Sequence, residues 1–206
     1  MMISFKPIDK NTLASSYSSD MTAFTPEDIN QIILEAARIQ IDLSRIVFSD
    51  SNDASKLHTH YDFEMDRLYV PKKVIPSTQY LSCHPRDVMS ITASLAREYY
   101  GHRLYRDEYL SDLKKGENYH SLPHWQDECR ASITAAKITP NLSRMERSYL
   151  FMDAAQIAEE AGYVIELDDY MKNILFVDYY KPDIPFVPEK FKIHFVNREN
   201  QEKENT

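Results

Sequence analysis

The spacing of apolar residues along the chain predicts mostly helices, with a few short strands between them. A first helix begins at Pro26 with Thr25 as its N-cap, and its apolar face is formed by Ile29, Ile32, Ile33, Ala36 and Leu43. Further helices are expected at about 85–103, 125–138, 143–162 and 168–177. Alternating apolar positions predict strands at 45–50 and 190–196, and one long strand or a tight hairpin at 60–74. This pattern favours an α+β fold that is mainly helical, with a small sheet.

Polar segments at both ends divide the chain into an arm, a domain and a tail. Residues 1–24 end in a stretch rich in Ser and Thr, which predicts a flexible arm. Residues 25–196 contain all the expected elements, and a chain of 206 residues favours a single domain. The polar and charged residues 197–206 predict a disordered tail.

The helix predicted at about 85–103 carries an acid and an imidazole on its apolar face. Val88, Ile91 and Leu95 form a stripe at helical spacing, and Glu98 and His102 continue the same stripe. Burying such groups is unfavourable unless each finds a partner, a proton or a metal ion. This helix is therefore the candidate functional element.

The helix predicted from Trp125 supplies a second acid. Glu128 shares a face with Ala131 and Ala135, and these small side chains let two helices approach closely. A Glu and a His from one helix with a Glu from another is close to what a zinc hydrolase needs. Where a further histidine ligand would be expected, the chain has Arg97.

Two segments, REYYGH at 97–102 and DECRAS at 127–132, resemble HELLGH and EECRAE of the dipeptidyl-peptidase III family, which are zinc peptidases of the gluzincin type. The resemblance covers residues 96–132 and implies a minimal zincin-like domain whose sheet packs on the motif-bearing helices. By position it implies that Glu98 is the general base, and that His102 and Glu128 are zinc ligands. Arg97 falls on the first histidine ligand of that family.

The spacing of the first motif has a geometric consequence. Residues 97 and 102 are five positions apart, which is about 140° around an ideal α-helix. Both can face one metal ion only if the helix carries an extra residue, as in a π-bulge. Gly101 suits such a distorted turn or the close approach of a neighbouring backbone, and the alternative is that Gly101 ends the helix as a C-cap.

Other side chains near the motifs are candidates for auxiliary roles. His84 is either a replacement ligand or a helix-entry histidine satisfied by backbone groups. His120, His124 and Tyr99 are candidates for stabilising an oxyanion, as are Tyr100 and Tyr119. Cys129 lies about 100° from Glu128 on a helix, which favours a role in core packing.

Three interpretations of function are possible, and they differ in whether a metal ion binds beside Arg97. A guanidinium has no lone pair for zinc, so the chain is expected to bind zinc weakly or not at all, with Arg97 instead pairing with Glu98 or Glu128. The first interpretation is a metallopeptidase relative with an impaired metal site, weakly active or a pseudoenzyme that binds a partner. The alternatives are an active zinc-dependent peptide hydrolase with a non-standard ligand set, and a helical interaction domain in which Glu98 and His102 are only a hydrogen-bonded pair.

Composition narrows the choice of partners and compartment. The net charge of −8 argues against a nucleic-acid surface, and no apolar run is long enough to span a membrane. A peptide or protein, as substrate or binding partner, is therefore expected, and the substrate and oligomeric state are left open. Two cysteines do not make a disulfide framework, so a cytoplasmic protein is the default, although secretion by a signal-less route would leave the same sequence.

Overall fold

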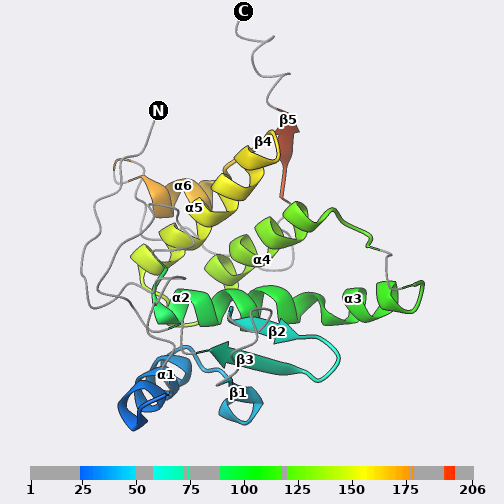
Figure 1. Ribbon diagram of the computed structural model, residues 1–206. Helices are drawn as coiled ribbons and strands as arrows, with labels where there is room; N and C mark the ends of the chain where they lie inside the picture. Colours follow the sequence, from blue (N-terminus) through cyan, green and yellow to red (C-terminus); the bar gives the residue numbers. More distant parts are fainter. Residues whose placement is uncertain are drawn as a thin grey trace, which may run out of the picture.

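The computed structural model describes residues 24–49, 58–71, 74, 89–116, 120–176, 178 and 193–197, and these form a mainly helical α+β fold (Figure 1). The α-helices are α1 (Pro26–Arg38), α2 (Ile91–Ala96), α3 (Arg106–Leu113), α4 (His124–Ile138), α5 (Arg144–Glu160) and α6 (Asp169–Leu175). The strands are β1 (Ile46–Ser49), β2 (His60–Asp62), β3 (Arg67–Pro71), β4 (Tyr163–Ile165) and β5 (Phe195–Asn197). The fold class predicted from the sequence is confirmed.

A continuous helical rod runs from Ile91 to Leu113 and is the central element of the fold. It consists of α2, the π-helix η5 (Arg97–His102), the 3-10 turn η6 (Arg103–Tyr105) and α3. The rod lies between the sheet formed by β1, β2 and β3 on one side and α4 with α5 on the other (Figure 1). Residues of both predicted motifs therefore meet where η5 packs on α4.

The ends of this rod differ from the prediction. The helix begins at Ile91, where the Ser90 hydroxyl accepts a hydrogen bond from the Ala93 N–H at 3.1 Å, and residues 85–88 lie outside the described residues. At the other end, the predicted stop near Arg103 is wrong, because the chain continues through η6 into α3. The polar loop after the rod begins only beyond Leu113.

Gly101 is the contact point between the rod and α4. A Cβ atom placed on Gly101 would lie 2.8 Å from the carbonyl carbon of Ala131 and closer still to its oxygen. No side chain fits at that separation, so only glycine allows the two backbones to approach this closely. The C-cap interpretation of Gly101 is wrong, and the expected close approach of a neighbouring backbone is confirmed.

The main sheet is small and has the strand order β1-β3-β2, with β1 parallel to β3 and β2 antiparallel to it. Residues 60–71 thus form the hairpin that the sequence left as one of two options. Its turn includes Asp66, whose positive φ of 52° is tolerated by Asp better than by most side chains. The Asp66 carboxylate accepts hydrogen bonds from Tyr61, Arg45 and Arg103, which ties the hairpin to the rod.

The remaining elements largely follow the predicted pattern. Helix α5 lies within the predicted range 143–162: a capping box of Ser143 and Glu146 starts it, and Gly162 with φ 83° follows its end. Helix α4 begins one residue earlier than expected, and α6 is shorter than the predicted 168–177. The strand predicted at 190–196 is found only in part. Strand β5 runs from Phe195 to Asn197, and residues 193–194 are not in a strand. Residues 190–192 lie outside the described residues.

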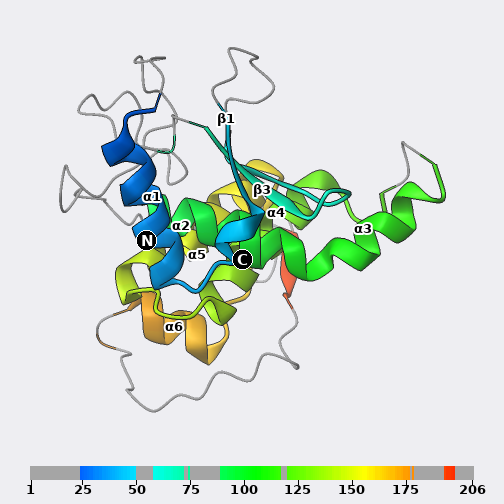
Figure 2. The same cartoon turned by 90° about the horizontal axis from the view of Figure 1, so that it is seen from below.

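Helix α1 lies alongside α2, at the opposite end of the molecule from α3 (Figure 2). Arg38 at its end donates to Glu146 of α5 at 2.5 Å and to Thr92 of α2 at 2.8 Å, so one side chain joins three helices. None of the described helices is both long and apolar enough to cross a membrane.

Candidate functional site

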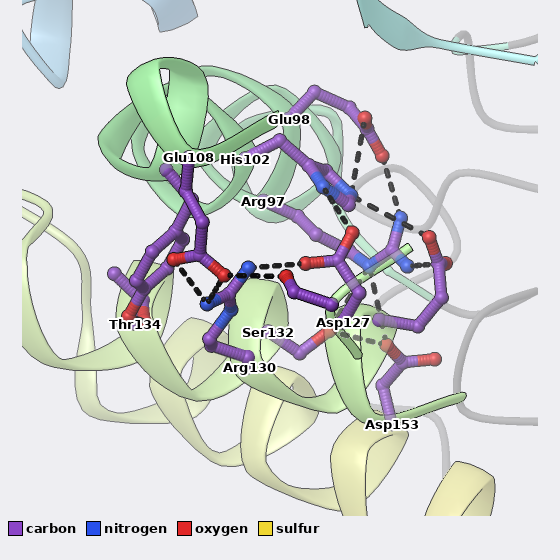
Figure 3. A network of polar contacts seen from close by, with 12 residues as sticks. Arg97, Glu98, His102, Glu108, Asp127, Arg130, Ser132, Thr134 and Asp153 are labelled. Atoms are coloured by element: carbon purple, nitrogen blue, oxygen red, sulfur yellow. Dashed lines mark hydrogen bonds and ion pairs between the residues drawn. The ribbon is translucent and has the colours of Figure 1, made fainter. Parts of the chain in front are cut away.

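The two motifs bring Glu98, His102 and Glu128 together, as the sequence predicts. Figure 3 shows Glu98 and His102 in this cluster. His102 Nε2 lies 3.7 Å from Glu98 Oε2 and 3.7 Å from Glu128 Oε1. The His102 residue is only 7% exposed, so the three groups meet in a largely buried place. The expected convergence of the helices is confirmed.

The π-helix places residues 97 and 102 on the same side of the rod. Arg97 donates to Glu128 Oε2 while His102 faces the other oxygen of the same carboxylate, Oε1. An α-helical turn would separate these two positions by about 140°, whereas the wider π-turn aligns them. The distortion that the five-residue spacing required is present at the expected residues, Arg97–His102.

Arg97 occupies the centre of this site. Its guanidinium donates to Glu98 Oε1 at 2.5 Å, to Glu128 Oε2, and through Nε to the Ser132 hydroxyl at 3.0 Å. The same Nε lies 3.4 Å from Asp153 Oδ2. One buried cation is therefore held among three carboxylates from η5, α4 and α5.

The charge state of Arg97 follows from these contacts. Burial on its own lowers the pKa of Arg97, but attraction to Glu98, Glu128 and Asp153 outweighs it and raises the pKa above its ordinary value. The guanidinium stays protonated and offers only donors. It therefore contacts the surrounding carboxylates as a cation and a hydrogen-bond donor.

Asp153 and Ser132 are site residues that the motifs alone did not reveal. Asp153 is fully buried and accepts a hydrogen bond from Ser132 at 2.6 Å. A signal for Asp153 was present in the sequence, because it lies on the stripe of Leu150, Ala154 and Ile157 at helical spacing. An acid on an apolar stripe is the same kind of signal that singled out Glu98.

A second polar cluster lies next to the first (Figure 3). Arg130 donates to both oxygens of Glu108 at 2.9 Å and to Asp127 at 2.7 Å, and its guanidinium carbon lies 3.6 Å from the centre of the Tyr105 ring. Burial lowers the pKa of Arg130, but the hydrogen bonds to Asp127 and Glu108 raise it more. The other Asp127 oxygen lies 3.8 Å from His102 Nδ1, which links the two clusters.

A cavity of about 230 Å³ opens beside His102, and we call it the His102 cavity. His102, Asp127 and Glu128 contribute polar groups to its lining. Phe63 and Tyr109, whose rings stack with centres 4.1 Å apart, contribute apolar surface. The cavity therefore combines carboxylates, an imidazole and aromatic rings.

The auxiliary candidates divide into residues that line this cavity and residues that do not. His120 and His124 are in its lining, together with His102. Tyr99 is not, because its hydroxyl accepts a hydrogen bond from the Asp42 N–H at 3.4 Å beside the end of α1. The Tyr99 hydroxyl is thus bonded away from the cavity, and an auxiliary role for Tyr99 stays a prediction. His84 and Tyr119 lie outside the described residues.

Cys129 has the packing role that was predicted for it. It is fully buried, and its thiol donates to the Ala154 carbonyl at 3.2 Å. It joins α4 to α5 rather than contributing to the site.

Among the described residues, this site has a guanidinium where a further zinc ligand would be needed. The Arg97 guanidinium lies between Glu98 and Glu128, and a cation at that position opposes a second cation. In the part of the chain that the structure describes, no group of three or more His, Cys, Asp or Glu side chains is arranged to hold a metal ion. The site as it stands is an ion-pair cluster.

Comparisons with protein-family models, with curated proteins and with solved structures found no match for this chain. The resemblance to gluzincins rests on the two motifs alone.

Proposed function

We propose that this chain is a zincin-like domain in which an internal ion pair replaces the metal, and that it acts by binding a peptide or protein rather than by hydrolysing it. The observation that carries this proposal is the position of Arg97, whose guanidinium bridges Glu98 and Glu128. These are the residues that the motif resemblance implies for the general base and a zinc ligand.

The chemistry of a guanidinium supports binding over catalysis. A zinc hydrolase uses its metal as a Lewis acid that generates hydroxide at neutral pH. Arg97 holds η5 and α4 together as a metal ion would, but it has no vacant orbital to polarise water. The helices are thus cross-linked while the His102 cavity beside them remains able to accept a side chain.

The proposal is tested by measuring metal and hydrolysis on the same preparation. The full chain would be expressed with added zinc, dialysed and analysed by inductively coupled plasma mass spectrometry. It would also be incubated with a mixture of fluorogenic peptides, with and without a chelator. We expect zinc far below stoichiometric and no chelator-sensitive cleavage. Stoichiometric zinc with chelator-sensitive cleavage would overturn the proposal and support an active hydrolase with a non-standard ligand set.

A further inference from the structure

The His102 cavity has the size of a site for one side chain. Its volume of about 230 Å³ is below the roughly 300–1,000 Å³ that is typical of pockets for drug-sized ligands. It exceeds the roughly 150 Å³ of an engineered protein cavity that accepts benzene. A single long side chain of a partner peptide matches these limits better than a whole small molecule does.

The lining of the cavity favours a positive charge. Among the described residues it contains one guanidinium, that of Arg130, and four carboxylates, which belong to Glu108, Asp112, Asp127 and Glu128. Arg130 divides its donors between Glu108 and Asp127. Lys115 pairs with Asp112 at 3.1 Å, and Arg97 contacts Glu128 while also facing the carboxylates of Glu98 and Asp153. Among these described groups the carboxylates still outnumber the cations.

His102 supplies an independent indication of a ligand. The residue is more than nine-tenths buried and lines the cavity, yet no hydrogen bond from the described residues reaches either ring nitrogen. Its nearest polar neighbours are carboxylate oxygens at 3.7 and 3.8 Å, which is beyond hydrogen-bond distance. Buried polar groups are normally paired, so an N–H donor brought into the cavity would give the unprotonated ring nitrogen of a neutral His102 a partner.

The apolar part of the lining suits the stem of such a side chain. Phe63 and Tyr109 form a stacked pair, and Leu122 adds aliphatic surface. Lysine and arginine bury their methylene stems along apolar surface, and their cationic ends are attracted to aromatic faces. The aromatic pair and the carboxylates thus match the two halves of one basic side chain.

We propose that the His102 cavity binds the side chain of a Lys or Arg residue of a partner peptide, with His102, Asp127 and Glu128 facing its cationic end and Phe63 and Tyr109 packing on its stem. This inference rests on the proposed binding function and names the class of its partner. A basic segment is also the complement of a chain whose net charge is −8.

The test uses the full chain labelled with ¹⁵N and four acetylated, amidated alanine pentapeptides whose central residue is lysine, arginine, norleucine or glutamate. Backbone amide shifts would be followed up to about 10 mM peptide, which detects dissociation constants in the millimolar range. We expect the lysine and arginine peptides to shift resonances of Phe63, His102 and Asp127. The norleucine and glutamate peptides should bind at least about tenfold more weakly, the scale of one lost charged hydrogen bond.

Two substitutions sharpen this test. Asp127→Asn keeps the size of the side chain and should weaken binding of the lysine peptide, whereas Glu27→Gln, an exposed change at the start of α1, should not. Equal binding of the norleucine peptide, preferred binding of the glutamate peptide, or no shifts with any peptide would each overturn the cation site. The peptide titration tests only the cation site. The proposed function is tested separately, by the zinc content of the protein and by its cleavage of fluorogenic peptides.

Discussion

At position 97 a planar cation with five N–H donors stands where the motif resemblance implies a neutral imidazole. The two groups would act on the neighbouring carboxylates in different ways. A histidine would share a zinc ion with Glu128, whereas Arg97 contacts the carboxylates of Glu98 and Glu128 directly. The stability of the site should therefore depend on this one side chain.

Removing the guanidinium should destabilise the protein. Arg97→Ala leaves Glu98, Glu128 and Asp153 facing one another without their shared cation, and breaking a buried pair costs about 3–5 kcal/mol of unfolding free energy. Adding Glu128→Gln to Arg97→Ala removes one of the repelling charges and should recover part of that loss. Urea denaturation at pH 7 of the wild type, both single variants and the double variant measures the coupling. A neutral effect of Arg97→Ala would contradict the bridging role.

Replacing Arg97 by histidine should create a zinc site. The π-helix already directs position 97 and His102 toward Glu128, so only the ligand type is missing at the first position. We expect Arg97→His to bind zinc at least about tenfold more tightly than the wild type, since losing even an outer-shell partner of a metal site changes affinity about 10–100-fold. Cobalt substitution should give the visible absorption of a tetrahedral site.

Arg97→Gln is the matched control for this prediction, because it removes the charge without adding an imidazole. Zinc titration of both variants distinguishes a gained ligand from a lost repulsion. If the histidine and glutamine variants bind zinc equally weakly, then the groups around position 97 are not arranged as a latent metal site.

At the scale of elements, the contact between η5 and α4 depends on glycine. In an ordinary helix interior, Gly→Ala stabilises a protein by roughly 0.5–1 kcal/mol, because it reduces the entropy of the unfolded chain. At Gly101 the added methyl group meets the Ala131 backbone, so the sign should reverse. Overpacking of this kind costs about 1–3 kcal/mol.

Thermal and urea unfolding of Gly101→Ala should therefore show a clear loss of stability. Ala131→Gly in the same chain should not rescue it, because the obstacle is the carbonyl group of residue 131 and not its side chain. Rescue by that second change, or a stabilising effect of Gly101→Ala alone, would show that the two backbones are further apart than described.

At the scale of the whole molecule, one ion pair links three helices. Glu146 of α5 accepts from Arg38 of α1, and the same guanidinium donates to Thr92 of α2. Burial on its own raises the pKa of Glu146, but hydrogen bonds from Arg38 and from Ser143 outweigh it, and the pKa lies below the ordinary value of 4.5. A carboxyl group with a depressed folded-state pKa contributes stability above its unfolded pKa. That contribution is lost as the pH falls through the folded value.

Acid should therefore weaken the attachment of α1. We expect the free energy of unfolding of the wild type to fall as the pH drops below about 4.5, and Glu146→Gln to flatten that dependence while lowering stability at pH 7. Glu27→Gln, an exposed change on α1, controls for the loss of one acidic group. Urea unfolding monitored by circular dichroism across this pH range measures the slopes, and equal slopes for wild type and Glu146→Gln would contradict the linkage.

The sequence determined the elements and the central residues of the site, because local signals are strong there. The capping residues Thr25 and Ser143 placed the starts of α1 and α5, whereas Leu43, predicted on the apolar face of the first helix, lies beyond the end of α1 at Arg38. The stripe that passes from Leu95 to Glu98 and His102 marked the site, since a buried polar group on an apolar face demands a partner. The five-residue spacing of the first motif, with the resemblance that implies both ends face one site, indicated a π-turn.

The tertiary structure decided how these groups are paired and what surrounds them. Whether Arg97 turns toward solvent or toward Glu98 and Glu128 depends on the distance between two helices, which periodicity within one helix does not contain. Asp153 became a partner of Arg97 only because α5 packs on α4, and Gly101 became a contact point only because Ala131 lies opposite. The His102 cavity likewise combines residues from the hairpin, the rod and α4, and its shape exists only when these segments are packed together.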